Sequence, residues 1–205
     1  MKYREIIFLT FIFIGCIGQE AELEVGEEEI TPIEDFFVFD LGVQPDIDIT
    51  EWRLEVTGLV DNPLVLTYEE ILELPSVTQV THLQCVMGDL EGTGEWTGVP
   101  LKYILEMAQY KENTVSVIFY AADEYFSSID IETARREDTI LAYKMNGVTL
   151  PKEHGYPLRL VIPGKLGYKW VKWLVRIELV DYEFEGYWES RGYSNIGDTP
   201  KAKSR

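Results

Sequence analysis

Residues 144–176 read KMNGVTLPKEHGYPLRLVIPGKLGYKWVKWLVR, and their pattern and charge set the expectations for the whole chain. Asn146-Gly147 between two apolar runs predicts a β-hairpin, and residues 158–162 and 175–180 predict further strands. The stretch carries a single acid, Glu153, whereas the whole chain of 205 residues has 36 acidic and 18 basic residues and a formal net charge of −18. Its basic residues are Lys144, Lys152, Arg159, Lys165, Lys169, Lys172 and Arg176. The stretch therefore predicts β structure with a local excess of positive charge.

This concentration of positive charge indicates an anion-binding site. The guanidinium of Arg is a planar fork that suits phosphate oxygens, and Gly155, Gly164 and Gly167 allow backbone N–H groups to approach a ligand. The simpler alternative is that these bases form the solvated face of strands. Aromatic residues between the bases would also suit nucleic acid, but the acidic remainder of the chain would repel a phosphate backbone. We therefore expect a small, multiply charged anion and no nucleic acid.

The N-terminus has the pattern of an export signal. Lys2 and Arg4 precede an apolar run over residues 6–17, which is too short to span a bilayer but is typical of a signal peptide. The run leads into Phe-Ile-Gly-Cys ending at Cys16, which resembles a lipobox, so that Cys16 would be lipidated. An ordinary signal peptide or a short anchor is the alternative. We expect residues 1–16 to direct export and to anchor the protein on the outer face of the cytoplasmic membrane.

The remaining chain divides into three parts. Residues 17–32 are rich in Glu and predict an acidic tether, residues 33–194 predict one domain, and residues 195–205 predict a polar tail that we expect to be frayed. Within the domain, we expect strands at residues 52–58, 77–83 and 115–119. A capping box at residues 67–70 and Pro100 each predict the start of a helix, the second running over residues 101–109. Strands outnumber helices, which predicts an α+β, mixed β-rich domain.

Several functional classes are excluded by missing motifs. The chain has no G-x-G-x-x-G, Walker, H-E-x-x-H or G-x-S-x-G sequence and only two histidines, which argues against a protein-only zinc site and a Ser-His-Asp hydrolase. With Cys16 lipidated, Cys85 would be a lone thiol in an oxidising compartment, where no disulfide is available to it. It is either a buried, inert cysteine or a metal ligand.

Three segments resemble the sulfite oxidase superfamily, the molybdopterin-binding oxidoreductase domain. They are THLQCVMG with WTGVPLKYIL (residues 81–88 and 96–105), DEYFSSIDI with LAYKMNGVTLPKEHGYPLRLVIPG (123–131 and 141–164), and GYKWVKWLVRIEL with GYWESRGY (167–179 and 186–193). The resemblance covers roughly residues 50–193 and implies the mixed β-rich fold of that family.

The resemblance assigns roles to the candidate residues. Cys85 matches the family's thiolate ligand to molybdenum, with tungsten as a second possibility, and a soft thiolate suits such a metal. His154, Arg159 and Lys172 match positions that bind the molybdopterin cofactor, whose phosphate is the anion that the basic stretch predicts. Lys165 and Lys169 are assigned to the phosphate by charge alone.

Two further residues lie in the matching segments. Tyr125 matches the family's active-site tyrosine, which would donate a hydrogen bond or a proton beside the metal, although an aromatic anchor in a loop is the alternative. His82 lies three residues before Cys85 and either faces the cofactor or is a hydrogen-bonded structural histidine.

The implied activity is a two-electron oxygen-atom transfer or reduction of a small substrate. Two histidines argue against an internal haem, so a separate, membrane-associated electron carrier is expected. Residues 86–91 contain Asp89 and Glu91 but no base, which disfavours dianionic sulfite and favours a neutral S-oxide or N-oxide.

Two alternatives to this enzyme stay open. One is a non-catalytic lipoprotein that keeps the fold as a binding module, and the other is an anion-binding lipoprotein without a metal. The N-terminus reads Lys2-Tyr3-Arg4 rather than a twin arginine, so the cofactor is inserted after export, the export route differs, or the cofactor has been lost. The joint presence of Cys, His, Arg and Lys favours the enzyme.

Overall fold

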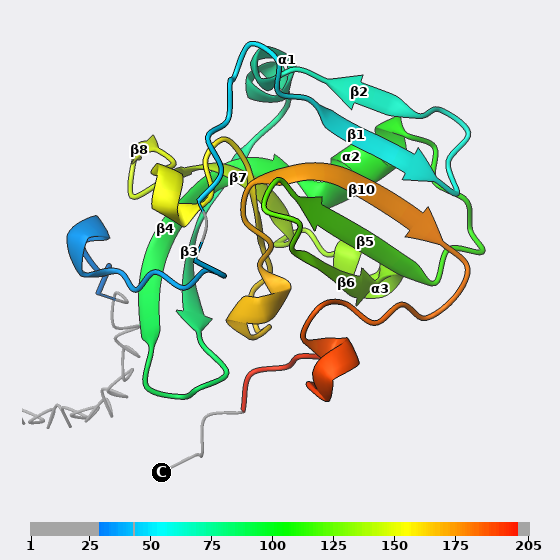
Figure 1. The fold of residues 1–205 in the computed structure, drawn as a ribbon. Coiled ribbons are helices and arrows are strands. Elements are labelled where there is room, and N and C mark those ends of the chain that lie inside the picture. The colour runs from blue at the N-terminus through cyan, green and yellow to red at the C-terminus, as the bar shows by residue number, and fades with distance from the viewer. Residues whose placement is uncertain (1–28, 43, 201–205) are drawn as a thin grey trace, which may run out of the picture.

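Two β-sheets form the framework of the chain (Figure 1). The computed structural model describes residues 29–42 and 44–200. The first sheet has the strand order β2-β1-β10-β5-β6, in which β1 and β10 are parallel and the other pairs antiparallel. Its strands are β1 (Leu54–Gly58), β2 (Leu64–Leu66), β5 (Ser116–Ala121), β6 (Phe126–Asp130) and β10 (Leu174–Val180).

The second sheet is antiparallel and has the order β3-β4-β7-β8, with β9 also paired to β7. Its strands are β3 (Val77–Gln84), β4 (Glu91–Pro100), β7 (Ile140–Met145), β8 (Val148–Thr149) and β9 (Arg159–Val161). The helices are short. They are α1 (Tyr68–Glu73), α2 (Leu101–Met107) and α3 (Ile131–Ala134), with 3-10 turns η1 (Ile33–Asp35), η2 (Lys152–His154), η3 (Gly167–Lys169) and η4 (Glu189–Arg191).

The predicted fold class, α+β and β-rich, is confirmed, and so are its strongest local signals. Thr67 and Glu70 form the reciprocal hydrogen bonds of a capping box at the start of α1. Asn146 and Gly147 both have positive φ, 49° and 77°, between β7 and β8, as a tight hairpin turn requires. Helix α2 ends at Met107, two residues earlier than predicted, and Gln109 follows in the left-handed region with φ 54°.

Strand β4 was not predicted, because its sequence contains three glycines. At Gly98, a Cβ would lie 2.2 Å from the carbonyl oxygen of Leu141 on β7. At Gly92, it would lie 2.8 Å from the ring of Phe36. Glycine has a low strand propensity, but here it allows neighbouring groups to approach the strand closely.

The ends of the chain show one difference from expectation. The predicted signal peptide with Cys16, and residues 17–28 of the predicted tether, lie outside the described residues. The prediction of a frayed tail is wrong as far as Thr199, because backbone hydrogen bonds join Gly197 to Leu166 and Thr199 to Gly164. None of the helices within residues 29–42 and 44–200 has the length and apolar character that crossing a membrane requires.

Candidate cofactor pocket

One cavity collects most of the predicted site residues. Four segments line it: residues 37–41, the end of β3 with the turn after it, the turn between β5 and β6, and the region from η2 to the start of β10. Trp188 and Tyr193 from the C-terminal segment complete the wall. The predicted residues in this lining are Cys85, Tyr125, His154, Arg159 and Lys172.

Cys85 lies at the first position after β3. The residue is 8% exposed and its thiol is free. The backbone N–H of Cys85 donates to Leu90 O and its carbonyl accepts from Gly88, so a tight turn fixes the residue at the end of the β3–β4 hairpin. Gly167 lies opposite, where a Cβ would stand 4.0 Å from Cys85 Cα. The fold therefore directs a single thiol into the cavity.

Arg159 is a buried cation on β9, 3% exposed. Its Nη1 donates to His154 O at 3.0 Å, and its guanidinium lies 4.8 Å from the ring centroid of Trp96 and 5.8 Å from that of Trp170. Its Nε has no hydrogen-bond partner among the described residues. Burial lowers the pKa of Arg159 to about 9, which still leaves the group charged at neutral pH.

Lys172 supplies a second cation to the cavity. Its Nζ donates to Glu153 O at 3.0 Å and lies 4.1 Å from the ring centroid of Trp173. Burial, reinforced by the charge of Arg159, lowers the pKa of Lys172 to about 8. Within the described part of the chain, neither Arg159 nor Lys172 forms an ion pair with a carboxylate. The hydrogen bonds of both cations are thus to backbone carbonyls, while the carboxylates of Asp40, Asp123 and Glu153 act on Lys172 only from beyond ion-pair distance.

His154 is neutral at physiological pH. It is 2% exposed, and burial together with the charge of Arg159 lowers its pKa to about 4. Its ring meets Phe36 edge-on, with 5.6 Å between ring centroids. A neutral imidazole contributes a hydrogen-bonding group without adding charge.

Tyr125 precedes β6 and extends into the cavity. Its phenol donates to the carbonyl oxygen of Tyr168 at 2.6 Å, and its backbone N–H donates to Asp123 Oδ1. Burial, with the nearby charge of Glu189 next in size, raises the pKa of Tyr125 far above its ordinary value. The phenol therefore keeps its proton over the whole physiological range.

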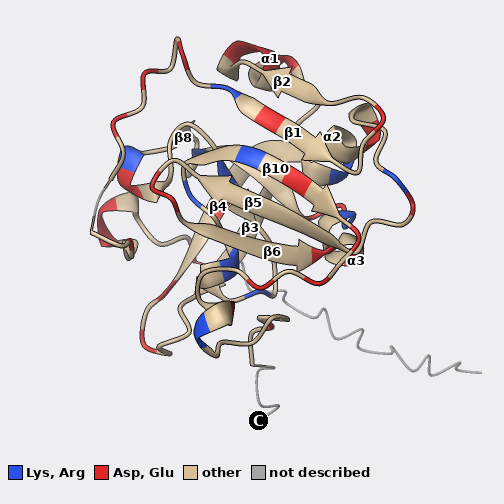
Figure 2. Cartoon of the chain, turned by 45° about the vertical axis from the view of Figure 1, so that its right-hand side comes forward, with Lys and Arg blue, Asp and Glu red and all other residues tan. Residues whose placement is uncertain are grey.

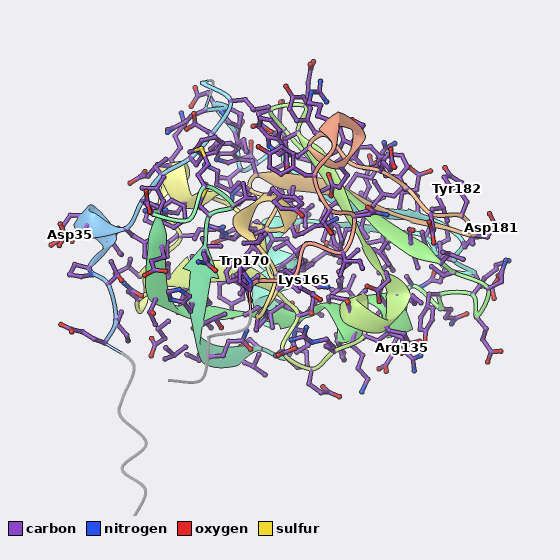
Figure 3. The ribbon with its side chains drawn as sticks, turned by 90° about the horizontal axis from the view of Figure 1, so that it is seen from below. Asp35, Arg135, Lys165, Trp170, Asp181 and Tyr182 are labelled. Carbon is purple, nitrogen blue, oxygen red and sulfur yellow. The ribbon has the colours of Figure 1, made fainter. Side chains whose placement is uncertain are left out.

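Three other predicted residues lie away from this cavity. His82 is exposed on β3, where Nδ1 contacts Thr93 Oγ1 at 3.1 Å and Nε2 lies 3.4 Å from Glu91. Lys165 pairs with Asp198 at 2.6 Å, and Lys169 forms a fully buried ion pair with Glu189. Figure 3 shows Lys165 next to Trp170, whose indole N–H donates to the Lys165 carbonyl. These three residues do not line the cavity.

Several cavity residues were not assigned a role from the sequence. Residues 37–41 were expected only as the beginning of the domain, yet Val38, Phe39 and Leu41 line the cavity with exposed fractions of 42–46%. Trp188 and Tyr193 lie in the GYWESRGY segment, which the resemblance included without naming a function for them. Asp123 also lines the cavity, and burial raises the pKa of its carboxyl.

The residues present fit an anionic cofactor that brings its own metal. The orphaned Nε of buried Arg159 and the unpaired Lys172 suit a phosphate-bearing group. Within residues 29–42 and 44–200, no group of three or more His, Cys, Asp or Glu side chains could hold a metal ion by itself. A single buried thiol suits a metal whose other ligands come from the cofactor.

Comparisons with known proteins identify the family of the chain. Residues 41–188 match the family described as oxidoreductase molybdopterin binding domain. A putative protein-methionine-sulfoxide reductase subunit, YedZ1, from Azospira oryzae is 38% identical over 152 residues, covering 74% of this chain and 58% of the relative. The uncharacterized oxidoreductase YuiH from Bacillus subtilis is 36% identical, covering 74% and 76%.

More distant relatives extend the match to larger enzymes. Sulfite oxidase from Arabidopsis thaliana is 30% identical, covering 80% of this chain and 51% of that protein. The structure of the sulfane dehydrogenase SoxCD from Paracoccus pantotrophus superposes with a TM-score of 0.71 at 30% identity, over 77% of this chain and 45% of that one. The chain thus spans little more than half the length of most of these relatives. From its pocket, its fold and residues 41–188, we conclude that this chain belongs to the family of oxidoreductases with a molybdopterin-binding domain, whose members carry a molybdenum cofactor.

Proposed function

We propose that this protein is a molybdopterin-dependent oxidoreductase that reduces a small, neutral S-oxide or N-oxide. The observation that carries the proposal is the cavity itself, in which the free thiol of Cys85 shares one space with Arg159 and Lys172, two cations without a carboxylate partner. A binding module that had lost its cofactor would have no reason to keep two cations without a carboxylate partner around a buried thiol, since a buried charge without a partner is costly.

Each residue has a distinct role toward the cofactor. Cys85 would supply a thiolate to the metal, while Arg159, Lys172 and His154 would hold the pterin and its phosphate. When bound, the cofactor supplies two-electron redox chemistry at molybdenum. Reduction of an S-oxide consumes two electrons and two protons, and it releases a thioether and water. The Trp, Phe and Tyr side chains of the cavity walls would reduce the access of water to the bound cofactor.

Tyr125 is the residue best placed to hold a proton at the reacting centre. Its phenol stays protonated, and the Tyr168 carbonyl fixes the position of its oxygen. Rotation of the hydroxyl hydrogen away from that carbonyl would let the same oxygen donate to a substrate oxygen. Tyr125 therefore acts as a hydrogen-bond donor or general acid rather than as a base.

The preference for a neutral substrate follows from the mouth of the cavity. Apolar side chains are exposed there, Met87 at 61% and Val86 at 40%, beside Phe39 and Leu41. Asp40 and Asp123 add negative charge, which disfavours a dianion such as sulfite. The name of the Azospira oryzae relative, a putative protein-methionine-sulfoxide reductase subunit, supports an S-oxide.

Electron supply and location complete the proposal. A separate, membrane-associated redox protein would deliver the two electrons, and the name "subunit" of that relative supports a partner of this kind. Lipidation of Cys16 would anchor the protein on the outer face of the cytoplasmic membrane. Fractionation of cells that express the Cys16→Ala variant checks the anchor, because the variant should leave the membrane fraction.

The proposal is tested by measuring the metal and pterin content of the purified mature domain and of its Cys85→Ser variant. Turnover of both proteins is then measured with a reduced viologen dye as electron donor. We expect about one molybdenum and one pterin per chain in the wild type, because one thiol, that of Cys85, lines the cavity. The variant should lose S-oxide turnover and change or lose its metal spectrum. Folded wild-type protein without pterin, made with an active cofactor pathway, would leave only a binding lipoprotein. A loaded protein that turns over sulfite but no S-oxide or N-oxide would reject the substrate.

A further inference from the structure

The C-terminal strap, residues 186–199, runs from the first sheet across the loop of η3, and Figure 1 shows it in orange-red below β6. It begins against β6, where Tyr187 N–H donates to Phe126 O at 2.9 Å. Gly186 allows this approach, because a Cβ there would lie 2.7 Å from Ser127 Cα and 2.9 Å from Phe126 O. Glycine at this position therefore brings the strap into direct contact with the sheet.

A buried ion pair joins the strap to both neighbouring elements. Lys169 and Glu189 have side chains that are 0% exposed. Glu189 Oε1 accepts from Lys169 Nζ and, at 2.6 Å, from Ser127 Oγ of β6. Lys169 Nζ also donates to Ser128 O at 2.8 Å. Strand β6, turn η3 and the strap thus meet in one hydrogen-bonded group.

The residues next to this group form the wall of the cavity. Trp188 precedes Glu189, and both Trp188 and Tyr193 line the cavity. Tyr168 precedes Lys169, accepts from the Tyr125 phenol, and donates its own hydroxyl to Ser194 O at 2.7 Å. A shift of the ion pair would therefore move two wall residues and the acceptor that orients Tyr125.

Stability alone does not account for two buried charges at this place. Replacing a buried ion pair by apolar residues of similar volume is often neutral or stabilising, because each charge loses its hydration on burial. What this ion pair adds is geometry, since Lys169 Nζ and Ser127 Oγ reach Glu189 Oε1 in one arrangement only, whereas the buried Glu189 Oε2 has no hydrogen-bond partner among the described residues. Here that arrangement holds a cavity wall.

We propose that Lys169 and Glu189 are positioning residues, which fix the C-terminal strap so that Trp188, Tyr193 and Tyr125 take their places around the cavity. Lys169 is accordingly no ligand of the phosphate. The kinetic part of this inference rests on the proposed function, whereas the structural part concerns the strap in any state of the protein.

Hydrogen exchange and kinetics of Glu189→Gln in the cofactor-loaded protein test the inference. The matched control is Glu185→Gln, the same change at an exposed acid four residues earlier. For Glu189→Gln, we expect amide exchange in residues 186–194 to rise about 10-fold. Its kcat should fall about 10- to 100-fold with little change in KM, because misplacement of a catalytic donor acts mainly on the chemical step. Metal and pterin content should stay at the wild-type level, and the control should match the wild type throughout.

A Lys169→Met/Glu189→Met double variant separates geometry from charge. It leaves no unpaired buried charge, so we expect it to fold and to bind the cofactor while its strap exchanges as fast as in Glu189→Gln. Cofactor content that falls in parallel with activity would instead make Lys169 a cofactor ligand and overturn the inference. Wild-type exchange and kinetics in this variant would overturn it as well.

Two further measurements cover the cases in which the variants do not fold or the wild-type protein lacks the proposed activity. If neither variant folds, Ser127→Ala removes one donor to Glu189, and exchange in residues 186–194 should rise about 3-fold; unchanged exchange would reject the inference. If wild-type protein reduces no S-oxide or N-oxide, the proposed function fails, but the exchange measurement, repeated on cofactor-free protein, still decides whether the ion pair holds the strap.

Discussion

Two pairs of bases from the same stretch of sequence have opposite fates in the structure. Arg159 and Lys172 lie beside the cavity without a carboxylate partner. Lys165 and Lys169 instead form ion pairs with Asp198 and with Glu189, two acids of the C-terminal strap. The difference shows that a base can bind a ligand when the fold brings no acid to it, and forms a structural ion pair when the fold does. Figure 2 shows that acids are spread along the chain, so their positions in the sequence alone do not indicate which base will form an ion pair.

The largest expected effect is on the free energy of unfolding of cofactor-free protein when one base of each kind is replaced by methionine. Lys169→Met leaves Glu189 buried and unpaired and should lower the free energy of unfolding by about 3–5 kcal/mol. Arg159→Met removes a cation that has no carboxylate partner and should change it by no more than about 1 kcal/mol. Urea unfolding of both variants beside the wild type measures this contrast.

The same two variants should behave differently toward the cofactor. Arg159→Met should purify with at least about 10-fold less pterin, because a charge-assisted hydrogen bond to phosphate is lost. The distinction between the two kinds of base would be contradicted if Arg159→Met destabilised cofactor-free protein as strongly as Lys169→Met does. It would also be contradicted if Arg159→Met retained a full complement of pterin.

A smaller effect is expected in the dependence of the free energy of unfolding on pH. The folded-state pKa of Lys172 is lowered to about 8 and that of Arg159 to about 9, so above pH 8 the unfolded chain binds more protons than the folded one. Stability of the cofactor-free protein should therefore rise between pH 7.5 and 9.5, before the tyrosines titrate. Urea unfolding in phosphate-free buffers measures the rise, which should be smaller in Lys172→Met and in cofactor-loaded protein. A fall in stability over this interval in the wild type would contradict the assignment of two uncompensated cations.

The smallest effect is expected at Lys165. Its partner Asp198 is 66% exposed, so Asp198→Asn should cost about 1 kcal/mol or less, as is usual for ion pairs near the surface. Cofactor content should not change. Thermal unfolding and metal analysis check both points, and a loss of pterin in this variant would show that Lys165 belongs with Arg159 after all.

Predictions from local sequence succeeded where neighbours along the chain decide the conformation. The capping box at Thr67 and the hairpin turn at Asn146-Gly147 need only residues a few positions away, and both are present. Strand β4 was missed because its glycines are explained by Phe36 and Leu141, which are distant in sequence. Local propensity penalises such glycines, whereas tertiary packing requires them.

The candidate site shows the same division. Cys85, Tyr125, His154, Arg159 and Lys172 were chosen from motifs, and the fold brings them to one cavity. His82 and Lys165 were chosen from their nearness in sequence or their charge, and they lie elsewhere. Trp188 and Tyr193 carried a signal in the GYWESRGY segment, but nothing local indicated that this segment closes a wall of the cavity.

The sequence by itself determined the β-rich fold class, the family and the set of groups that can hold an anionic metal cofactor, because these depend on residue type and on short-range spacing. Only the tertiary structure decided which of the bases remain free for that anion. Pairing between distant charges depends on where the folded chain buries each partner, and burial sets the energetic value of every charge. Lys169 and Lys172 are three residues apart, yet one is bound to Glu189 and the other borders the cavity.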